Sequence, residues 1–332
     1  MARASLALLT SFGALLVACG GSSGNPGAGD ASHPSIDGSP SGLDATTHID
    51  GALPADGASP TGPDPAGDGS ATVTSGDVSI PGTGSAVVPA TVYQPAAGAA
   101  PRPLVVISPG FQMERAQYAS YAHHLATWGF VVVLTDYADK SFFADHQAMA
   151  DNVGKVIDWA IGQHSLDVDA AKIATAGHSL GGDISVLAAA DDTRVKAVVG
   201  WDPVDATSPS VVPEHMTHMT AAIAVVGETT DGGAGFSACA PTAENYAAFY
   251  AASPSPAVQL TVANASHMNW VDDPTCALCT LCTAAANPVD PATVHAITRR
   301  LTVAWLRKHL LADATMDAWL AAAPAGTTLV TK

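Results

Sequence analysis

The sequence predicts an α/β fold, in which a mostly parallel central sheet carries helices on both faces and begins with an antiparallel N-terminal edge. Short runs rich in valine and isoleucine alternate with longer segments of helical periodicity from residue 71 onward. This alternation favours a parallel sheet that is covered on both sides. The first two runs are separated only by Pro81-Gly82-Thr83-Gly84, which favours a hairpin and hence the antiparallel edge.

The expected strands are recognised by their β-branched or continuously apolar composition. The first two are β-branched, whereas later runs such as Leu104-Val105-Val106-Ile107 are apolar throughout, as in strands buried on both faces. In chain order, strands are expected at residues 73–80, 86–93, 104–108, 130–135, 172–176, 195–201, 221–227 and 257–262.

The expected helices lie between or after these strands and show apolar residues at helical spacing. In the segment 143–164, Val153, Val156, Ile157 and Ile161 fall on one helical face. In chain order, helices are expected at residues 117–128, 143–164, 180–190, 244–251 and 291–311.

The N-terminus has the composition of an export signal. Residues 1–18 carry Arg3 and then an apolar run that is too short to remain as a membrane span. The run ends in Leu16-Val17-Ala18-Cys19, which resembles the bacterial lipobox, so we expect cleavage before Cys19 and a lipid on its thiol. The alternative is an ordinary cleaved signal followed by an incidental cysteine.

A polar segment follows the signal. Residues 19–70 are rich in Gly, Ser, Pro and Asp, a composition that predicts a disordered tether. Residues 71–332 then form the folded domain. We therefore expect an exported protein that is lipid-anchored to a bacterial membrane, in the periplasm or at the cell surface.

Acidic residues dominate the charge of the chain. Its 332 residues include 13 Lys or Arg and 30 Asp or Glu, which gives a net charge of −17. Because phosphate backbones repel so acidic a chain, we expect no nucleic-acid partner.

A glycine-rich pentapeptide stands between an expected strand and an expected helix. Gly177-His178-Ser179-Leu180-Gly181 fits the pattern G-x-S-x-G, in which a tight turn exposes a serine hydroxyl above the sheet. The alternative is a glycine-rich turn with an incidental serine. The strand before the motif and the helix after it favour a catalytic nucleophile, so the sequence predicts this role for Ser179.

A serine nucleophile needs a base, and in folds with this motif the chain order is serine, acid, histidine. His267 follows the last expected strand by a few residues, which places it at the carboxyl edge of the sheet. We therefore expect His267 to be the base. The other histidines after Ser179 precede a strand or lie in the last helix: His215, His218, His295 and His309.

The spacing leaves the acid that orients this base open. Asp202 follows the strand 195–201, whereas Glu228 and Asp231 follow the strand 221–227. Both loops open at the same edge of the sheet, so either could reach the histidine.

Two backbone amides are expected to stabilise the oxyanion of an acyl transfer. One is the amide of Leu180, directly after the nucleophile. The other is the amide of Phe111, because Pro109 has no N–H and Gly110 permits a sharp turn after the strand 104–108.

Four cysteines lie beyond Cys19: Cys239, Cys276, Cys279 and Cys282. In a cytosolic protein the C-x2-C-x2-C spacing of the last three would indicate a metal site. Export instead favours two disulfides, with Cys239 joined to one of the other three. The pairing stays open, and no metal or cofactor is expected.

Several of these segments resemble the chlorophyllase family. The resemblance covers roughly residues 75–310 and rests on the serine motif, on Trp201-Asp202-Pro203-Val204-Asp205, on Cys239-Ala240-Pro241 and on His267-Met268. It implies the α/β-hydrolase fold, ester hydrolysis, and Asp202 as the acid. The platelet-activating-factor acetylhydrolases use the equivalent strand end. Leu180 replaces a basic residue typical of the plant enzymes, so chlorophyll is not the expected substrate.

A second resemblance is to bacterial cutinases and polyester hydrolases. It rests on Ile107-Ser108-Pro109-Gly110-Phe111 and Trp128-Gly129-Phe130-Val131-Val132, and it implies Asp231 as the alternative acid. Such enzymes need an exposed apolar cleft, which the side chains of Phe111, Trp201 and Trp270 are expected to line.

The expected function is carboxylic ester hydrolysis, esterase- or lipase-like, through a Ser179–His267–Asp202 triad and an acyl-enzyme, without a cofactor. The expected partners are a small-molecule or lipid ester and, through the N-terminal anchor, a membrane; we expect a monomer. The alternative enzyme is a cutinase-like polyester hydrolase. The alternative from another class is a surface-anchored binding protein that keeps the scaffold and has lost catalysis.

Overall fold

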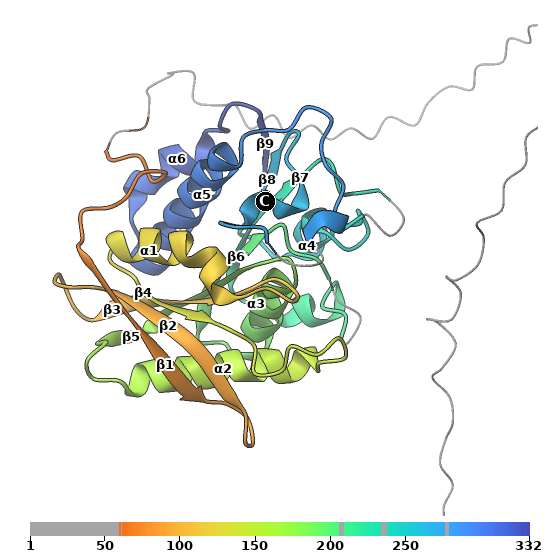
Figure 1. Ribbon diagram of the computed structural model, residues 1–332. Helices are drawn as coiled ribbons and strands as arrows, with labels where there is room; N and C mark the ends of the chain where they lie inside the picture. Colours follow the sequence, from red (N-terminus) through yellow and green to blue (C-terminus); the bar gives the residue numbers. More distant parts are fainter. Residues whose placement is uncertain (1–59, 61, 206–208, 234–237, 276–278) are drawn as a thin grey trace, which may run out of the picture. The chain divides into compact units, whose positions relative to one another are not determined.

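One nine-stranded sheet runs through the part of the chain that the computed structural model describes, which comprises residues 60, 62–205, 209–233, 238–275 and 279–332 (Figure 1). These residues belong to one unit, Gly57–Lys332. The strand order is β1-β2-β4-β3-β5-β6-β7-β8-β9. The strands are β1 Val73–Pro81, β2 Val87–Pro95, β3 Arg102–Ser108, β4 Val131–Thr135, β5 Val168–His178, β6 Val195–Trp201, β7 Ala222–Glu228, β8 Ala257–Val262 and β9 Thr327–Thr331.

The strand directions confirm the predicted mostly parallel sheet with an antiparallel N-terminal edge. All pairs between β4 and β8 along the sheet are parallel, while β1 pairs antiparallel with β2, and β2 antiparallel with β4. The carboxyl ends of β5, β6, β7 and β8 therefore meet at one edge. The sequence did not reveal β9, which pairs antiparallel with β8 and makes the other edge antiparallel too.

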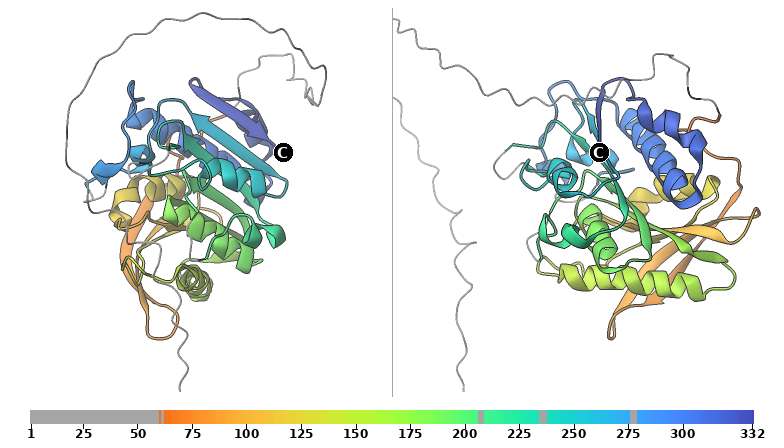
Figure 2. Two further views of the ribbon diagram at one scale, coloured as in Figure 1. Left: turned by 90° about the vertical axis from the view of Figure 1, so that its right-hand side faces the viewer. Right: turned by 180° about the vertical axis from the view of Figure 1, so that it is seen from behind.

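Helices cover both faces of this sheet (Figure 2). One hydrophobic cluster joins the sheet to α1 and α5, and a second joins its other face to α2, α3 and α4. The α-helices are α1 Ala119–Thr127, α2 His146–Gly162, α3 Leu180–Asp191, α4 Tyr246–Ala252, α5 Pro291–Leu311 and α6 Asp317–Ala321. Short 3-10 helices are η1 Arg115–Tyr118, η2 Glu214–His218, η3 His267–Trp270, η4 Cys279–Leu281 and η5 Ala314–Met316.

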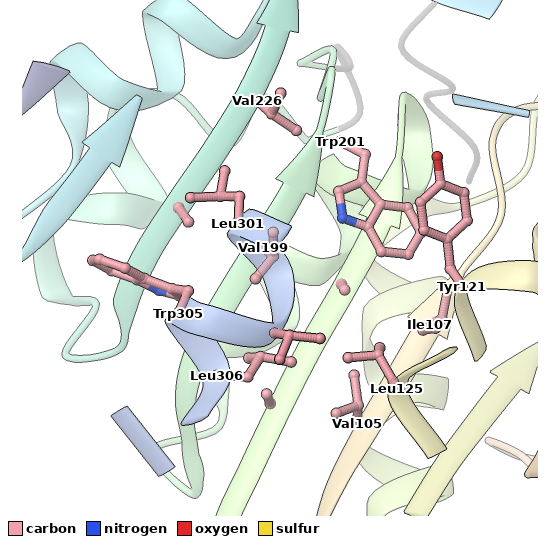
Figure 3. Close-up of a cluster of buried hydrophobic side chains, with 14 of the residues drawn as sticks. Val105, Ile107, Tyr121, Leu125, Val199, Trp201, Val226, Leu301, Trp305 and Leu306 are labelled. Atoms are coloured by element: carbon pink, nitrogen blue, oxygen red, sulfur yellow. The ribbon is translucent and has the colours of Figure 1, made fainter. Parts of the chain in front are cut away.

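Two tryptophans that were expected to line a cleft lie in the core instead. Trp201 and Trp270 are both 0% exposed. Trp201 stacks on Tyr121 with ring centroids 4.5 Å apart (Figure 3), and its indole N–H donates to Thr302 Oγ1. The indole N–H of Trp270 donates to Thr298 Oγ1. Each indole N–H is bound to a hydroxyl on α5, so both rings can be enclosed completely. The prediction that they line an exposed cleft was wrong.

The folded domain also begins earlier than the composition predicted. Asp64 pairs with Arg300 of α5, at 2.5 Å and 3.0 Å, and Asp68 Oδ1 lies 2.8 Å from His124 Nδ1 of α1. The carbonyl of Gly67 accepts the indole N–H of Trp128. Polar contacts with two helices thus order residues 62–70 without large apolar side chains, so the predicted tether was wrong over this stretch. The expected export signal, the expected lipidation site Cys19 and residues 20–59 lie outside the described residues.

No helix in the described ranges has the length and apolar character needed to cross a membrane.

Candidate active site

Ser179 lies in a strained turn between β5 and α3. Its backbone has φ 55° and ψ −124°, a conformation that non-glycine residues rarely adopt. A Cβ on Gly177 would lie 2.3 Å from the carbonyl oxygen of Gly181, and one on Gly181 would lie 2.1 Å from that of Ser108. Only glycine fits at these two positions, which is the physical reason for the spacing of the motif. The turn leaves Ser179 half-buried at the N-terminus of α3.

His267 contacts the serine hydroxyl from the loop after β8. Its Nε2 lies 2.9 Å from Ser179 Oγ. The residue opens η3, whose first turn is closed by a capping box between Ser266 and Asn269. The His267 side chain is almost completely buried, which shields its hydrogen bonds from water.

Asp202 binds the other nitrogen of the same imidazole. Its Oδ2 lies 2.6 Å from His267 Nδ1, and its side chain is 0% exposed. Asp202 directly follows β6 and has a positive φ of 43°, which is uncommon for a residue other than glycine. Burial raises the pKa of the Asp202 carboxyl, and the hydrogen bond with His267 opposes this shift. Of the three candidate acids, Asp202, Glu228 and Asp231, it is Asp202 that contacts the imidazole ring.

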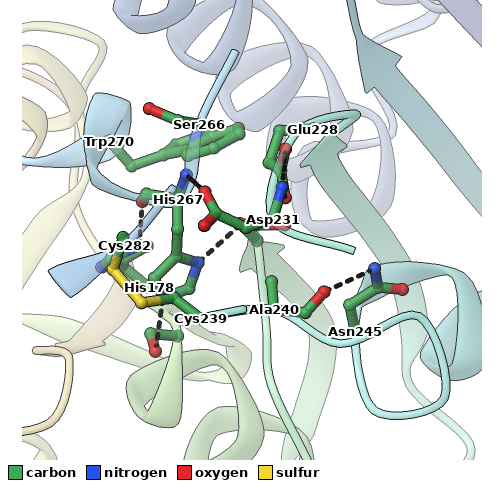
Figure 4. A network of polar contacts seen from close by, with 12 residues as sticks. His178, Glu228, Asp231, Cys239, Ala240, Asn245, Ser266, His267, Trp270 and Cys282 are labelled. Atoms are coloured by element: carbon green, nitrogen blue, oxygen red, sulfur yellow. Dashed lines mark hydrogen bonds and ion pairs between the residues drawn. A yellow bond between two sulfur atoms is a disulfide. The ribbon is translucent and has the colours of Figure 1, made fainter. Parts of the chain in front are cut away.

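Asp231, the alternative acid, binds backbone amides (Figure 4). Its Oδ2 accepts the N–H of His267 at 2.8 Å, and its Oδ1 accepts the N–H of Thr283 at 2.7 Å. The carboxylate therefore joins two loops and anchors the peptide bond that precedes the imidazole.

A third carboxylate, Glu228, is buried beside these two. It is 3% exposed at the end of β7, and its oxygens accept the N–H groups of Thr230 and Asp231. Burial, reinforced by the charge of Asp202, raises the pKa of Glu228 from 4.5 to about 7.

This raised pKa predicts a stability change with pH. The unfolded chain releases the Glu228 proton near pH 4.5 and the folded chain only near 7, so folding is penalised progressively between these values and by a constant amount above them. Urea unfolding at pH 5, 6, 7 and 8 should show the free energy of unfolding of the wild type falling relative to that of Glu228→Gln. The exposed Glu244→Gln should follow the wild type. Parallel curves for wild type and Glu228→Gln would contradict the assignment.

The loop after β3 lies beside the serine turn. Tyr137 Oη donates to the Pro109 carbonyl at 2.8 Å, and the Gly110 N–H donates to Tyr118 Oη at 3.2 Å. Phe111 carries the next amide along this loop. Leu180 occupies the first position of α3, where a backbone N–H has no partner within the helix.

A disulfide joins Cys239 to Cys282. It ties the loop after β7 to the segment that contains Thr283, next to the carboxylate of Asp231 (Figure 4). Cys276, one of the other expected partners, lies outside the described residues. A carboxylate oxygen of Asp231 and the two sulfurs are close enough to suit a metal ion, but the disulfide uses both thiols.

The sequence did not indicate the roles of His178 and Tyr118, which both lie in this site. His178 occupies a variable position of the serine motif, and its buried ring lies 4.6 Å from the ring of His267. Tyr118 binds it from η1. Neither position carries a sequence signal, because nothing in the spacing shows that their side chains meet.

Comparison with known proteins adds a family to this geometry. Residues 67–325 match the family model described as Chlorophyllase. No curated protein matches the sequence significantly.

Proposed function

Because the chain belongs to the chlorophyllase family and is therefore an ester hydrolase with an α/β-hydrolase fold, we propose that it cleaves carboxylic esters through Ser179, His267 and Asp202. The observation that carries the proposal is one continuous set of hydrogen bonds. Ser179 Oγ lies 2.9 Å from His267 Nε2, and His267 Nδ1 lies 2.6 Å from Asp202 Oδ2. This order of nucleophile, base and acid suits acyl transfer to serine.

In the proposed mechanism, His267 Nε2 takes the proton of Ser179 as Oγ attacks the ester carbonyl. The imidazolium is oriented and stabilised by Asp202. It then returns the proton to the alkoxide leaving group, so that the alcohol departs and an acyl-enzyme remains. Water, deprotonated by His267, attacks the acyl-enzyme and releases the carboxylic acid and free Ser179.

We propose that the amides of Leu180 and Phe111 bind the oxyanion of both tetrahedral intermediates. Leu180 N–H points from the first turn of α3, where the helix dipole also favours negative charge. In the opposite loop, Pro109 has no N–H and that of Gly110 is bound to Tyr118 Oη. We therefore assign the second donor to Phe111, which carries the next amide along that loop.

The surroundings of Phe111 support an ester with an apolar group as the substrate. Phe142 and Phe143 are 66% and 95% exposed, and the ring of Phe142 lies edge-on to that of Phe111 with centroids 5.2 Å apart. The loop after β3 that carries Phe111 is here called the oxyanion loop. It is bound to the loop that carries Phe142 and Phe143, because Gln112 Nε2 donates to the Lys140 carbonyl. Adjacent exposed aromatic rings at a site mark a surface that binds apolar groups.

A series of p-nitrophenyl esters from acetate to palmitate tests this proposal. The wild type should hydrolyse the series, and Phe142→Ser/Phe143→Ser should lower kcat/KM about tenfold for octanoate while leaving acetate unchanged, because the apolar contact is lost. Val330→Ser, which removes another exposed apolar side chain, on β9, is the control. Failure of the wild type to cleave any ester would refute the function; equal losses at all chain lengths would refute only the apolar surface.

We further propose that the protein is exported and held to a membrane through a lipid on Cys19. The support is the segment Leu16-Val17-Ala18-Cys19 at the end of an apolar run. In a bacterial host, the full-length chain should sediment with membranes and be extracted by detergent, whereas Cys19→Ser should be largely soluble after cell lysis. Membrane association that is unchanged by this substitution would contradict lipidation.

A further inference from the structure

A buried chain of hydrogen bonds links the loop after β3 to the backbone of His267. The N–H of Gly110 donates to Tyr118 Oη at 3.2 Å, and Tyr118 Oη lies 2.8 Å from His178 Nδ1. His178 Nε2 lies 2.9 Å from the carbonyl oxygen of His267. The proposed mechanism uses neither the Tyr118 hydroxyl nor the His178 ring.

The direction of these bonds follows from the chemistry of the groups. A carbonyl oxygen only accepts, so His178 Nε2 carries a hydrogen and donates it to His267. In a neutral ring Nδ1 then accepts, and it receives the hydrogen of the Tyr118 hydroxyl. Met113 Sδ lies 2.9 Å from the same hydroxyl, but thioether sulfur is the weaker acceptor.

Burial keeps both groups neutral, which preserves this direction. Both side chains are essentially enclosed, at 1% exposure for His178 and 0% for Tyr118. Desolvation lowers the pKa of His178 well below its ordinary value, and the neighbouring His267 lowers it further. Desolvation likewise raises the pKa of Tyr118.

We propose that Tyr118 and His178 act as one unit of positioning residues, which holds the catalytic imidazole and the oxyanion loop in a common geometry. This inference rests on the proposed ester hydrolysis. His267 is held at both ends of its own backbone: Asp231 accepts its N–H and His178 donates to its C=O. The same unit binds Gly110, which directly precedes Phe111.

The packing around Gly110 agrees with this role. A Cβ at Gly110 would lie 3.0 Å from Tyr118 Oη and 3.2 Å from His178 Nδ1. A larger residue at Gly110 would therefore crowd both side chains. A displacement of about 1 Å in such a site lowers rates by about 100-fold.

The inference is tested with Tyr118→Phe, His178→Phe and the double variant, assayed on p-nitrophenyl acetate. Each single change should lower kcat about 10- to 100-fold with KM within about twofold, because positioning acts on the chemical step. The double variant should be about as slow as the worse single variant, because both residues belong to the same chain of hydrogen bonds and either change interrupts it. Tyr121→Phe is the matched control, since Tyr121 is equally buried, and it should keep the wild-type kcat.

A second substitution separates positioning from folding. His178→Gln retains an amide that can donate to the His267 carbonyl, so it should keep a higher kcat than His178→Phe. If His178→Phe fails to fold, judged by circular dichroism, Tyr118→Phe and His178→Gln carry the test alone. A wild-type kcat in Tyr118→Phe, losses that multiply in the double variant, or a change in KM alone would overturn the inference. An inactive wild type would instead refute the ester hydrolysis on which it rests.

Discussion

Replacing Ser179 with alanine is expected to lower kcat for p-nitrophenyl esters by about a millionfold, which leaves only the residual catalysis that substrate binding and the oxyanion amides provide. The change removes the only atom that the proposed mechanism joins to the acyl group. The fold should persist, because Ser179 is half-buried and the strain of its positive φ is borne by the backbone, which alanine shares. Steady-state kinetics and circular dichroism measure the two effects.

A fluorophosphonate probe provides the control on mechanism. The wild type should be labelled at one site, identified as Ser179 by peptide mass spectrometry, and the alanine variant should not be labelled. Absence of labelling in a folded wild type would favour the binding-protein alternative. Ester turnover that survives in Ser179→Ala at near wild-type rates would show that another residue is the nucleophile.

Replacing Asp202 with asparagine is expected to lower kcat by about 10,000-fold near neutral pH. The change keeps the size of the side chain and removes the negative charge that faces His267 Nδ1 at 2.6 Å. An amide group in this position permits the wrong imidazole tautomer and leaves the imidazolium unstabilised in a site that excludes water. KM should change far less than kcat, since Asp202 is enclosed and does not meet the substrate.

Asp231→Asn is the matched control for this prediction. It makes the same chemical change within the same group of carboxylates, but Asp231 binds the backbone N–H groups of His267 and Thr283. One amide oxygen retains one of these bonds, so we expect a loss of kcat of no more than about tenfold. If Asp231→Asn were as severe as Asp202→Asn, the assignment of the acid to Asp202 would be wrong.

The strands and helices were predictable because each leaves a local pattern. Strands buried on both faces contain continuous apolar runs, such as residues 104–107 of β3. The strand β6 and the helix α5 were expected with their observed bounds. β9 was missed because it is an exposed edge strand with few apolar residues. The ordered structure of residues 62–70 was missed because the residues that bind them, such as Arg300, are polar and distant in sequence.

In the candidate site, too, some residues could be predicted from local sequence patterns and others could not. The positions of Ser179 and His267 follow from a motif and from chain order. The pairing of Cys239 with Cys282, and the burial of Trp201, depend on contacts between segments that spacing does not connect. The same is true of Tyr118 and His178, which lie 60 residues apart in the chain.

By itself, then, the sequence determined the fold class, the family resemblance, and which serine and histidine lie at the carboxyl edge of the sheet. The tertiary structure decided which acid meets the imidazole. Asp202 and Asp231 follow neighbouring parallel strands and both reach His267, so no local pattern separates them. The difference lies in the atoms that each carboxylate contacts: Asp202 binds the imidazole ring of His267, while Asp231 binds the backbone amide of the same residue.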